Sequence, residues 1–323
     1  MDNILTVENL KLYYYTSKGV VKAVDDISFT LKKGETLGLV GESGCGKTTT
    51  GFALLKMPTP PGKIAGGRIK VDGIDITPLR ENEMRRNIRW EKISMVFQGA
   101  MNTLTPVYTI GKQMMETLQE HREMERDEAR KRIEKYLNLV GLSSDIVKRY
   151  PHELSGGMKQ RIAIATALFL EPKVIICDEP TTALDVIVQA QIINLLKDLK
   201  EKLDLSFIFI THDLATEAEV SDRIAVMYAG KIVEIGTNQQ IYGEQGPCHP
   251  YTKNLLAATP RLHERVSELS FIPGAPPDLL EPPSGCRFHP RCSLAMDKCK
   301  EEEPPLIEIE DEHMVACWRC EKR

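Results

Sequence analysis

The sequence predicts an α/β fold in which short buried strands alternate with helices. A glycine-rich loop stands between a strand-like run, TLGLV at residues 36–40, and a segment compatible with helix. Three later apolar runs of strand length end at polar side chains: ISMVF before Gln98, VIIC before Asp178, and SFIFI before Thr211. Because polar residues that follow buried strands point into the crevice where α/β sheets bind ligands, we expect the site at these strand ends.

The glycine-rich loop, residues 41–48, reads GESGCGKT and matches the phosphate-binding template G-x-x-x-x-G-K-[ST] at every fixed position. Its glycines let successive N–H groups and the positive end of the following helix face the phosphates of a nucleotide. Lys47 adds a positive charge at the β- and γ-phosphates, and Thr48 adds a hydroxyl ligand for Mg²⁺. The full match disfavours the alternative of a turn that binds nothing. The residues expected to contact the nucleotide here are Gly41, Ser43, Gly44, Cys45, Gly46, Lys47, Thr48 and Thr49.

The composition is that of an ordinary globular protein, with 42% hydrophobic and 27% charged residues in a chain of 323. The net charge of −4 shows no basic excess, which argues against a nucleic-acid partner. The N-terminus lacks the features of a signal peptide, and no run of about 18 apolar residues occurs. We therefore expect a cytosolic protein that can dock on a membrane partner.

The first segment of the chain carries a strand pattern. Residues 3–33 alternate in strand fashion around a central turn, which predicts an antiparallel sheet. Tyr13, Tyr14 and Tyr15 lie in it with their side chains on alternating faces. One of these rings could stack on a purine, or all three could simply pack or line an edge. Beyond the phosphate loop, Pro58–Gly67 is rich in proline and glycine and is expected to be loop.

A helical insert follows. From residue 110 to residue 140 the pattern is helical, with Ile133, Leu137 and Val140 on one face and Gly141 as a stop. An all-helical insert between two strands of a nucleotide-binding sheet suggests a subdomain that contacts another molecule.

The segment LSGGMKQR, residues 154–161, is a second anion-binding helix start. Ser155 can cap this helix, and the glycines, including Gly157, let backbone N–H groups approach a phosphate. One chain that binds one nucleotide does not need two such sites. Two copies that face each other, each lending this loop to the other's nucleotide, would use both.

The strand ends carry the candidate catalytic groups. Asp178 is placed to hold Mg²⁺ through water, and Glu179 could orient or deprotonate the attacking water. Gln98 is a candidate for Mg²⁺ or for that same water. His212, after the last apolar strand, is a plausible sensor of the γ-phosphate, although an isolated histidine is usually structural.

The eight cysteines are unevenly distributed. Cys45, Cys177 and Cys248 are scattered, whereas five crowd into the end of the chain: Cys286, Cys292, Cys299, Cys317 and Cys320. In a reducing cytosol such a cluster favours a metal over disulfides. The C-x-x-C turn of Cys317 and Cys320 is typical of a zinc site, and free thiols are the remaining alternative.

Together these motifs resemble the nucleotide-binding subunit of an ABC transporter over residues 3–258. The phosphate loop, Gln98, the signature LSGGM, the carboxylate pair, the aspartate loop ALD at 183–185 and His212 occur in the family's order. The fold that this implies is a P-loop NTPase core of ABC type with an antiparallel β-subdomain, a helical subdomain and a small cysteine-rich C-terminal extension. Met158 departs from the family, which most often has glutamine there, and activity is expected to survive because the neighbouring Ser155 and Gly157 contact the phosphate.

The resemblance implies a role for each motif residue. Glu179 is the catalytic base, Thr48 and Gln98 reach Mg²⁺, and His212 steadies the γ-phosphate. Tyr14 is the best match to the aromatic residue that stacks on adenine, with Tyr13 as the alternative. Ser155 and Gly157 would complete the site of the opposing subunit.

A narrower resemblance lies at the C-terminal end. HPYT at 249–252, IPGAPP at 272–277 and GCRFHPRC at 285–292 resemble the dipeptide and oligopeptide importer branch. In that branch the extension can carry a four-iron four-sulfur (4Fe-4S) cluster bound by four cysteines, which the resemblance matches to Cys286, Cys292, Cys299 and Cys317. The wide gaps between them fit a cluster better than a compact zinc knuckle, and zinc remains the alternative.

These resemblances imply a nucleotide-binding domain at 1–258, a helical subdomain at about 105–165, and an extension at 259–323. The implied function is ATP hydrolysis that drives import of dipeptides or oligopeptides. The implied partners are a second ABC ATPase subunit, which we expect to be a different chain, two membrane permease subunits at the cytoplasmic face, and an extracytoplasmic solute-binding protein. Import of oligosaccharides or nickel, or a soluble ABC ATPase acting on DNA or ribosomes, are the alternatives.

Overall fold

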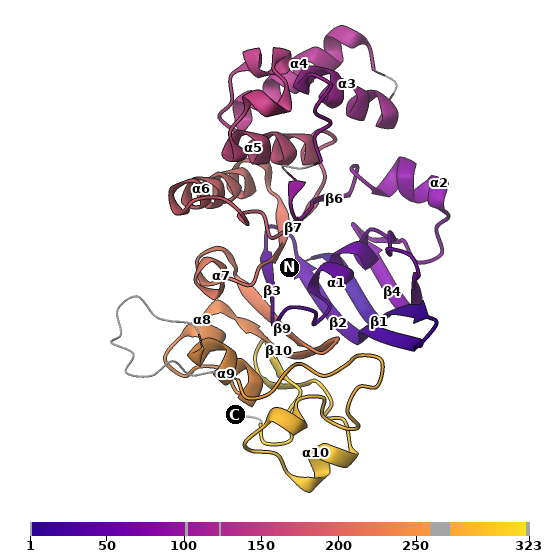
Figure 1. Cartoon of the computed structure of the whole chain (residues 1–323), viewed down its shortest axis with the longest axis vertical. Coiled ribbons are helices and arrows are strands. Elements are labelled where there is room, and N and C mark those ends of the chain that lie inside the picture. Colours follow the sequence, from indigo (N-terminus) through magenta and orange to yellow (C-terminus); the bar gives the residue numbers. More distant parts are fainter. Residues whose placement is uncertain (1, 101–102, 123, 259–271, 321–323) are drawn as a thin grey trace. The chain divides into compact units, whose positions relative to one another are not determined.

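The computed structural model describes residues 2–100, 103–122, 124–258 and 272–320, and the chain forms two compact units (Figure 1). The first unit comprises Met1–Leu5, Leu31–Gly34 and Lys70–Ile208, and the second comprises Thr6–Thr30, Glu35–Ile69 and Phe209–Arg323. The predicted domain boundary after residue 258 falls at the edge of residues 259–271, which lie outside the described residues.

The first two strands of the chain and the strand after α1 (Lys47–Leu54) form most of one sheet of the second unit. Strands β1 (Asn3–Thr16) and β2 (Gly19–Lys32) follow the predicted alternation, and β4 (Gly62–Val71) lies on the other side of β1. The prediction that Pro58–Gly67 is loop is therefore wrong for its second half. A Cβ on Gly67, whose φ is +94°, would lie 2.5 Å from the Cα of Leu10 in β1. Glycine is required here because a neighbouring backbone comes close, which sequence alone reads as a loop signal.

The second unit also contributes strands to a larger sheet, in the order β11-β12-β10-β9-β3. Strand β3 (Thr36–Val40) runs parallel to β9 (Arg223–Tyr228), in the register Leu37 opposite Arg223, and every residue of both strands is buried. Such continuous apolar runs are typical of parallel strands covered on both faces. Strand β10 (Lys231–Thr237) pairs antiparallel with β9.

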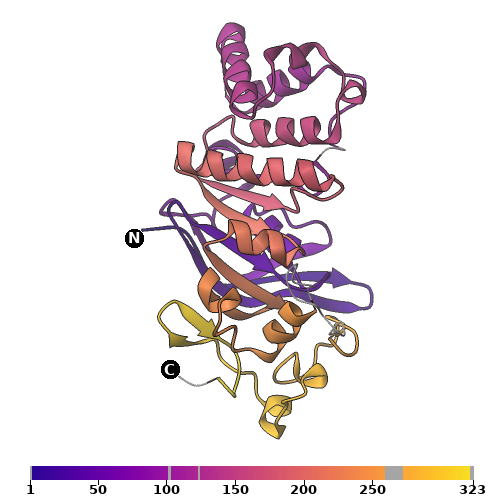
Figure 2. The same cartoon turned by 90° about the vertical axis from the view of Figure 1, so that its left-hand side faces the viewer.

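The C-terminal extension contributes two strands to that same sheet. Strand β12 (His313–Val315) pairs antiparallel with β10, with Glu234 opposite Val315, and β11 (Ile307–Glu310) pairs with β12. Figure 2 shows this yellow hairpin beside the orange strand. The extension is thus part of the core sheet, which the sequence pattern does not indicate.

The second unit also contains helices, of which α7 (Leu214–Val220) lies against β3 and α8 (Asn238–Tyr242) against β10. A core cluster joins the sheet to the extension, since Val226 and Tyr228 of β9 pack with Tyr251 and Phe288. The helices are α1 (Lys47–Leu54), α7 (Leu214–Val220), α8 (Asn238–Tyr242), α9 (Pro250–Ala257), the 3₁₀ turn η5 (His289–Arg291) and α10 (Asp297–Glu301).

The first unit contains parallel strands and a group of helices. Strand β6 (Ile93–Val96) pairs parallel with β7 (Val174–Asp178), with Val96 opposite Cys177, and β5 (Ile74–Asp75) pairs with the end of β4. Strand β8 (Ser206–Ile210) begins in this unit and ends in the other. The predicted strands before Gln98, Asp178 and Thr211 are confirmed.

The helical pattern predicted for residues 110–140 is confirmed. Residues 110–140 form two helices, α3 (Ile110–His121) and α4 (Arg126–Leu139), which lie together with α5 (Gly156–Ala167) in Figure 1. Ile133, Leu137 and Val140 are buried, as predicted. The remaining helical segments are α2 (Glu81–Glu83), the π-helical η1 (Met84–Ile88), η3 (Ser144–Lys148), η4 (Pro151–Glu153) and α6 (Val186–Leu203). Among the described residues, no helix combines the length and apolarity that a bilayer crossing requires.

Candidate functional site

The phosphate loop lies between β3 and α1 in the second unit. Gly46 has a φ of +107° and is the N-cap of α1, and a Cβ at this position would lie 2.3 Å from the carbonyl oxygen of Ala23. Only glycine therefore fits there. Having no side chain, Gly46 leaves the first N–H groups of α1 without a side-chain cap, and no acidic residue occupies the first turn. A helix start of this kind favours an anion.

Lys47 and its neighbours complete the loop. The Lys47 side chain is buried, and its Nζ donates to the carbonyl oxygens of Gly41 at 2.7 Å and Glu42 at 3.0 Å. The ammonium group is thus held inside the curve of the loop. Burial raises the pKa of the Cys45 thiol, so this side chain is uncharged. The positions that remain outermost are Ser43 and Gly44, which are exposed, and Thr48 and Thr49, which are partly buried.

The three tyrosines of β1 face different surroundings. The Tyr14 hydroxyl lies 3.5 Å from Oγ1 of Thr49, so its ring lies beside the first turn of α1. Tyr13 instead donates its hydroxyl to Asp25, and burial raises the pKa of Tyr13. Tyr15 is 47% exposed. Of the three rings, Tyr14 is the one next to the phosphate loop.

In the first unit, the ends of β6 and β7 bring two of the predicted catalytic residues together. Nε2 of Gln98 donates to Oε2 of Glu179 at 2.8 Å, and Oγ1 of Thr182 donates to the same oxygen at 2.9 Å. Asp178, the last residue of β7, is buried. Glu179 has a φ of +48°, an unfavourable conformation for a residue with a side chain, and one that costs of order 1–3 kcal/mol. Thr182 was not predicted as a site residue. Its position in the turn PTTALD, directly after the two carboxylates, is the sequence feature that could have indicated it.

The signature loop and the aspartate loop each begin a helix of the first unit. Ser155 is the N-cap of α5 and accepts a hydrogen bond from the N–H of Met158 at 3.3 Å, as predicted. A Cβ on Gly157 would lie 2.7 Å from Cγ1 of Val188 in α6. Asp185 caps α6 in the same way and is followed by Val186 and Ile187, whose exposed fractions are 79% and 72%.

His212 follows β8 in the second unit. It is exposed and precedes Asp213, the N-cap residue of α7. The predicted site residues therefore divide between the units. The phosphate loop, Tyr14 and His212 belong to the second unit, and Gln98, Asp178, Glu179, Ser155 and Gly157 belong to the first.

The four cysteines predicted to bind a cluster line one pocket. Cys286, Cys292, Cys299 and Cys317 surround it, together with Phe288, Leu294 and Trp318. Burial raises the pKa of Cys286 to about 11, and the neighbouring thiols raise it further. In the part of the chain that the structure describes, no three His, Cys, Asp or Glu side chains converge closely enough to hold a metal ion as they stand.

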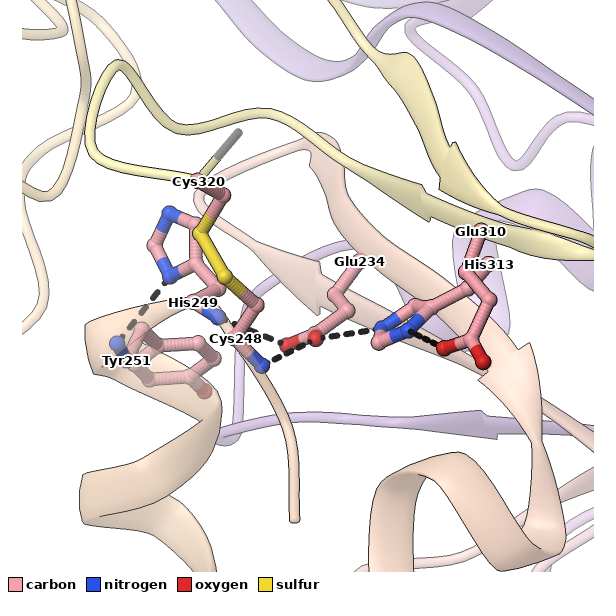
Figure 3. The surroundings of a disulfide bond; sticks show 7 residues. All are labelled: Glu234, Cys248, His249, Tyr251, Glu310, His313 and Cys320. Carbon is pink, nitrogen blue, oxygen red and sulfur yellow. Dashed lines mark hydrogen bonds and ion pairs between the residues drawn. A yellow bond between two sulfur atoms is a disulfide. The ribbon is translucent and has the colours of Figure 1, made fainter. Parts of the chain in front are cut away.

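Cys320 forms a disulfide with Cys248, at a Cα–Cα distance of 6.2 Å (Figure 3). The zinc knuckle of Cys317 and Cys320 is therefore wrong, because one of its sulfurs is already bonded. The expectation that the clustered cysteines would favour a metal over disulfides is also wrong for Cys320, which pairs with Cys248 from outside the cluster. The physical reason is the pairing of β12 with β10, which brings together cysteines 72 residues apart in sequence.

A buried hydrogen-bond network surrounds this disulfide. Glu234 is fully buried and accepts from the N–H of Cys248 at 2.6 Å, the N–H of His249 at 3.2 Å and Nε2 of His313 at 2.9 Å. His313 lies in β12 and Glu234 in β10, so the network ties the extension to the core sheet. Burial lowers the pKa of His249 to about 4.

The chain is similar to known proteins both in sequence and in structure. A family model described as ABC transporter matches residues 24–182, and one described as the C-terminal region of the oligopeptide/dipeptide transporter matches residues 233–299. The solved structure of cbiO1 from Clostridium perfringens, part of the ABC transporter complex cbiONQ, has a TM-score of 0.65 at 31% identity and covers 76% of this chain and 92% of that chain. A dimeric ATP-binding cassette bound to ADP and Pi has a TM-score of 0.64 at 29% identity and covers 72% of this chain and 98% of its own.

Fold and phosphate loop together define an ATP-hydrolysing enzyme of the ATP-binding cassette class. Among curated proteins, the oligopeptide transport ATP-binding protein OppD of Bacillus subtilis is 48% identical over 322 residues, which are 98% of this chain and 89% of OppD. The dipeptide transport ATP-binding protein DppD of the same organism is 47% identical over 326 residues, 100% of this chain and 96% of DppD. The chain belongs to the ABC transporter family, on the branch of the oligopeptide and dipeptide transport ATP-binding proteins.

Proposed function

We propose that this chain is the ATPase subunit that drives import of dipeptides or oligopeptides through separate membrane permease subunits. The observation that carries the proposal is the presence in one chain of the phosphate loop and of the C-terminal region shared with oligopeptide and dipeptide transporters. Oligopeptide transport by OppD and dipeptide transport by DppD, which are similar to nearly the whole chain, support peptides as cargo over oligosaccharides or nickel.

The site residues have separate roles in this proposal. Lys47 and the loop N–H groups hold the phosphates of ATP, Tyr14 stacks on adenine, and His212 steadies the γ-phosphate. Thr48 and Gln98 would hold Mg²⁺, with Asp178 reaching it through water; oxygen donors of this kind suit the ion, which when bound neutralises charge on the β- and γ-phosphates.

Glu179 is the proposed general base. It accepts a proton from the water that attacks the γ-phosphorus, while the bond from that phosphorus to the β-phosphate oxygen breaks. The hydrogen bonds from Gln98 and Thr182 to one carboxylate oxygen fix the orientation of the Glu179 side chain.

A second ATPase subunit completes the proposed site. Ser155 and Gly157 lie at the start of α5, and the exposed apolar pair Val186 and Ile187 begins α6. Exposed apolar side chains next to an anion-binding helix start suit a protein interface that also contacts nucleotide. The dimeric cassette structure at 29% identity supports two facing subunits. That the partner is a related but different chain rests on the resemblance to the importer branch.

The same proposal assigns a role to each remaining part of the chain. Residues 1–258 form the nucleotide-binding domain, residues 259–323 form the extension, and the helical subdomain at about 105–165 contacts the permeases. The assembly then lies at the cytoplasmic face of the membrane and receives peptide from a solute-binding protein outside.

We also propose a 4Fe-4S cluster bound by Cys286, Cys292, Cys299 and Cys317. Support comes from the four thiols that line one pocket with apolar walls, since thiolate sulfur is the ligand that such clusters take. The cluster would hold together an extension that has few apolar residues of its own. Anaerobically purified protein should be brown and contain about four iron and four sulfide per chain; colourless protein with zinc or without metal would overturn this assignment.

Transport in vesicles tests the main proposal. The chain, its partner ATPase and the permeases are reconstituted with ATP on the side of the ATPases, and uptake of labelled dipeptides, oligosaccharides and nickel is compared. Peptide uptake that requires ATP and is lost in Lys47→Ala is the expected result. ATP hydrolysis with no peptide uptake, or uptake of another cargo alone, would contradict it.

A further inference from the structure

One loop residue outside the phosphate-binding template is held at three points. The N–H of Glu42 donates to Oη of Tyr251 at 2.9 Å, and its carbonyl oxygen accepts from Nζ of Lys47 at 3.0 Å. Its carboxylate accepts from Nη1 of Arg291 at 2.6 Å and from Nη2 at 2.9 Å. Glu42 follows the first glycine of the template directly, so these bonds fix the start of the loop.

The ion pair between Arg291 and Glu42 is buried on the arginine side. The Arg291 side chain is 6% exposed, and its Nε donates to the carbonyl oxygen of Pro273 at 2.8 Å. Nη1 also lies 3.3 Å from Oη of Tyr228. The two parallel hydrogen bonds to one carboxylate are the strong, directional form of this interaction.

Arg291 comes from the middle of the cysteine-bearing segment. It ends the turn η5 and lies between Cys286 and Cys292. Two other side chains of this segment, those of Arg287 and Phe288, also enter the core. Arg287 pairs with Asp25 and donates to the carbonyl oxygen of Ala229.

The Phe288 side chain of this segment is 1% exposed. Its ring centroid lies 5.1 Å from that of Tyr228 and 5.3 Å from that of Tyr251, and both pairs meet edge to face. Tyr251 is the residue that binds the Glu42 N–H. The segment therefore contacts the phosphate loop directly through Arg291 and indirectly through this aromatic group.

We propose that Arg291 is a positioning residue for the phosphate loop, through which the C-terminal extension controls the affinity for ATP. The charge balance gives the physical reason. Paired with Arg291, Glu42 presents no net charge to the loop; without it, a carboxylate is left unpaired in a loop that receives phosphates, and the loop loses one of its three fixed points. The proposal rests on the proposed function only in that ATP is the ligand of the loop.

A double-mutant cycle tests the proposal in the full chain. Arg291→Gln should weaken ATP binding about tenfold and raise KM for ATP by a similar factor, with kcat changed by less than about twofold, because the lost interaction acts on bound ATP and transition state alike. Glu42→Gln should weaken binding less. The double variant should bind ATP more tightly than Arg291→Gln alone, since the unpaired charge is gone.

Arg319→Gln is the matched control, because Arg319 is an exposed arginine of the same extension that donates to the carbonyl oxygen of Leu294. Equal ATP affinity of Arg291→Gln and the wild type, or a double variant no better than Arg291→Gln, would overturn the proposal. If Arg291→Gln does not fold, Arg291→Met, which also removes the charge but keeps the length of the side chain, and its double variant with Glu42→Gln give the same comparison. Failure of the wild type to bind ATP would instead count against the proposed function.

Discussion

The phosphate loop and the C-terminal extension belong to the same compact unit but are built in opposite ways. The loop consists of eight consecutive residues whose backbone shape and charge are local properties. The extension is held by residues far apart in sequence: the disulfide spans 72 residues, and Arg291 and Glu42 are 249 apart. A local motif can be recognised in a sequence without its surroundings, whereas a non-local attachment cannot. The comparison predicts that a change at Glu179 stops ATP hydrolysis, whereas loss of the Cys248–Cys320 disulfide destabilises the extension.

The largest effect is expected at Glu179. Glu179→Gln keeps the hydrogen bond from Gln98 but removes the proton acceptor, so turnover should fall by at least about 100-fold while ATP binding is retained. Steady-state hydrolysis and a nucleotide titration measure the two quantities. Glu134→Gln, which removes a surface ion pair on α4, is the control. Turnover of Glu179→Gln at the wild-type rate would show that another group is the base.

Loss of the disulfide should weaken the extension more than the core. Cys248→Ala reopens a long loop and should destabilise the extension by about 2–4 kcal/mol. Trp318, which lies at the cysteine pocket, reports its unfolding in urea when Trp90 is replaced by phenylalanine. The wild type in reductant should behave like Cys248→Ala. If reductant leaves the transition of the wild type unchanged, the disulfide does not stabilise the extension.

Lowering the pH should also destabilise the attachment of the extension, because His249 follows Cys248 of the disulfide directly. His249 has a folded-state pKa of about 4, below the usual 6.5 because of burial, so the unfolded chain binds a proton more readily. Stability is therefore lost as the pH falls from about 6.5 to about 4, by about 1–3 kcal/mol.

His249→Asn should remove this acid sensitivity, because asparagine keeps an acceptor for the N–H of Tyr251 without titrating. Urea unfolding at several pH values between 4 and 8 measures the difference. His152→Asn, at an exposed histidine of the first unit, should leave the pH profile unchanged. An identical pH profile for His249→Asn and the wild type would exclude His249 as the source.

The smallest effect is expected at the aromatic residue beside the loop. Tyr14→Ala should weaken ATP binding about tenfold through the loss of stacking, whereas Tyr14→Phe should be close to neutral because the contact of its hydroxyl with Thr49 is long. Tyr15→Ala, at a half-exposed ring, is the control. If Tyr13→Ala weakens binding and Tyr14→Ala does not, the assignment of the adenine-stacking residue moves to Tyr13.

The strand ends were the most predictable part of the site. Gln98 and Glu179 meet because β6 and β7 are parallel neighbours, and the ends of parallel neighbours lie at one edge of a sheet. The glycines around Gly67 were misinterpreted because a close approach to β1 and a flexible loop leave the same trace in a sequence.

By itself, the sequence determined the chemistry of this protein: the phosphate loop, the carboxylates at the strand ends and the capped signature helix are all encoded within a few consecutive residues. Only the tertiary structure decided how the extension is attached, through the added strands β11 and β12, the pair Cys248 and Cys320, and the contact of Arg291 with Glu42. The physical reason is that each of these depends on partners brought together by the folding of the whole unit, and no local pattern specifies which distant residue a strand edge, a thiol or a guanidinium group will meet.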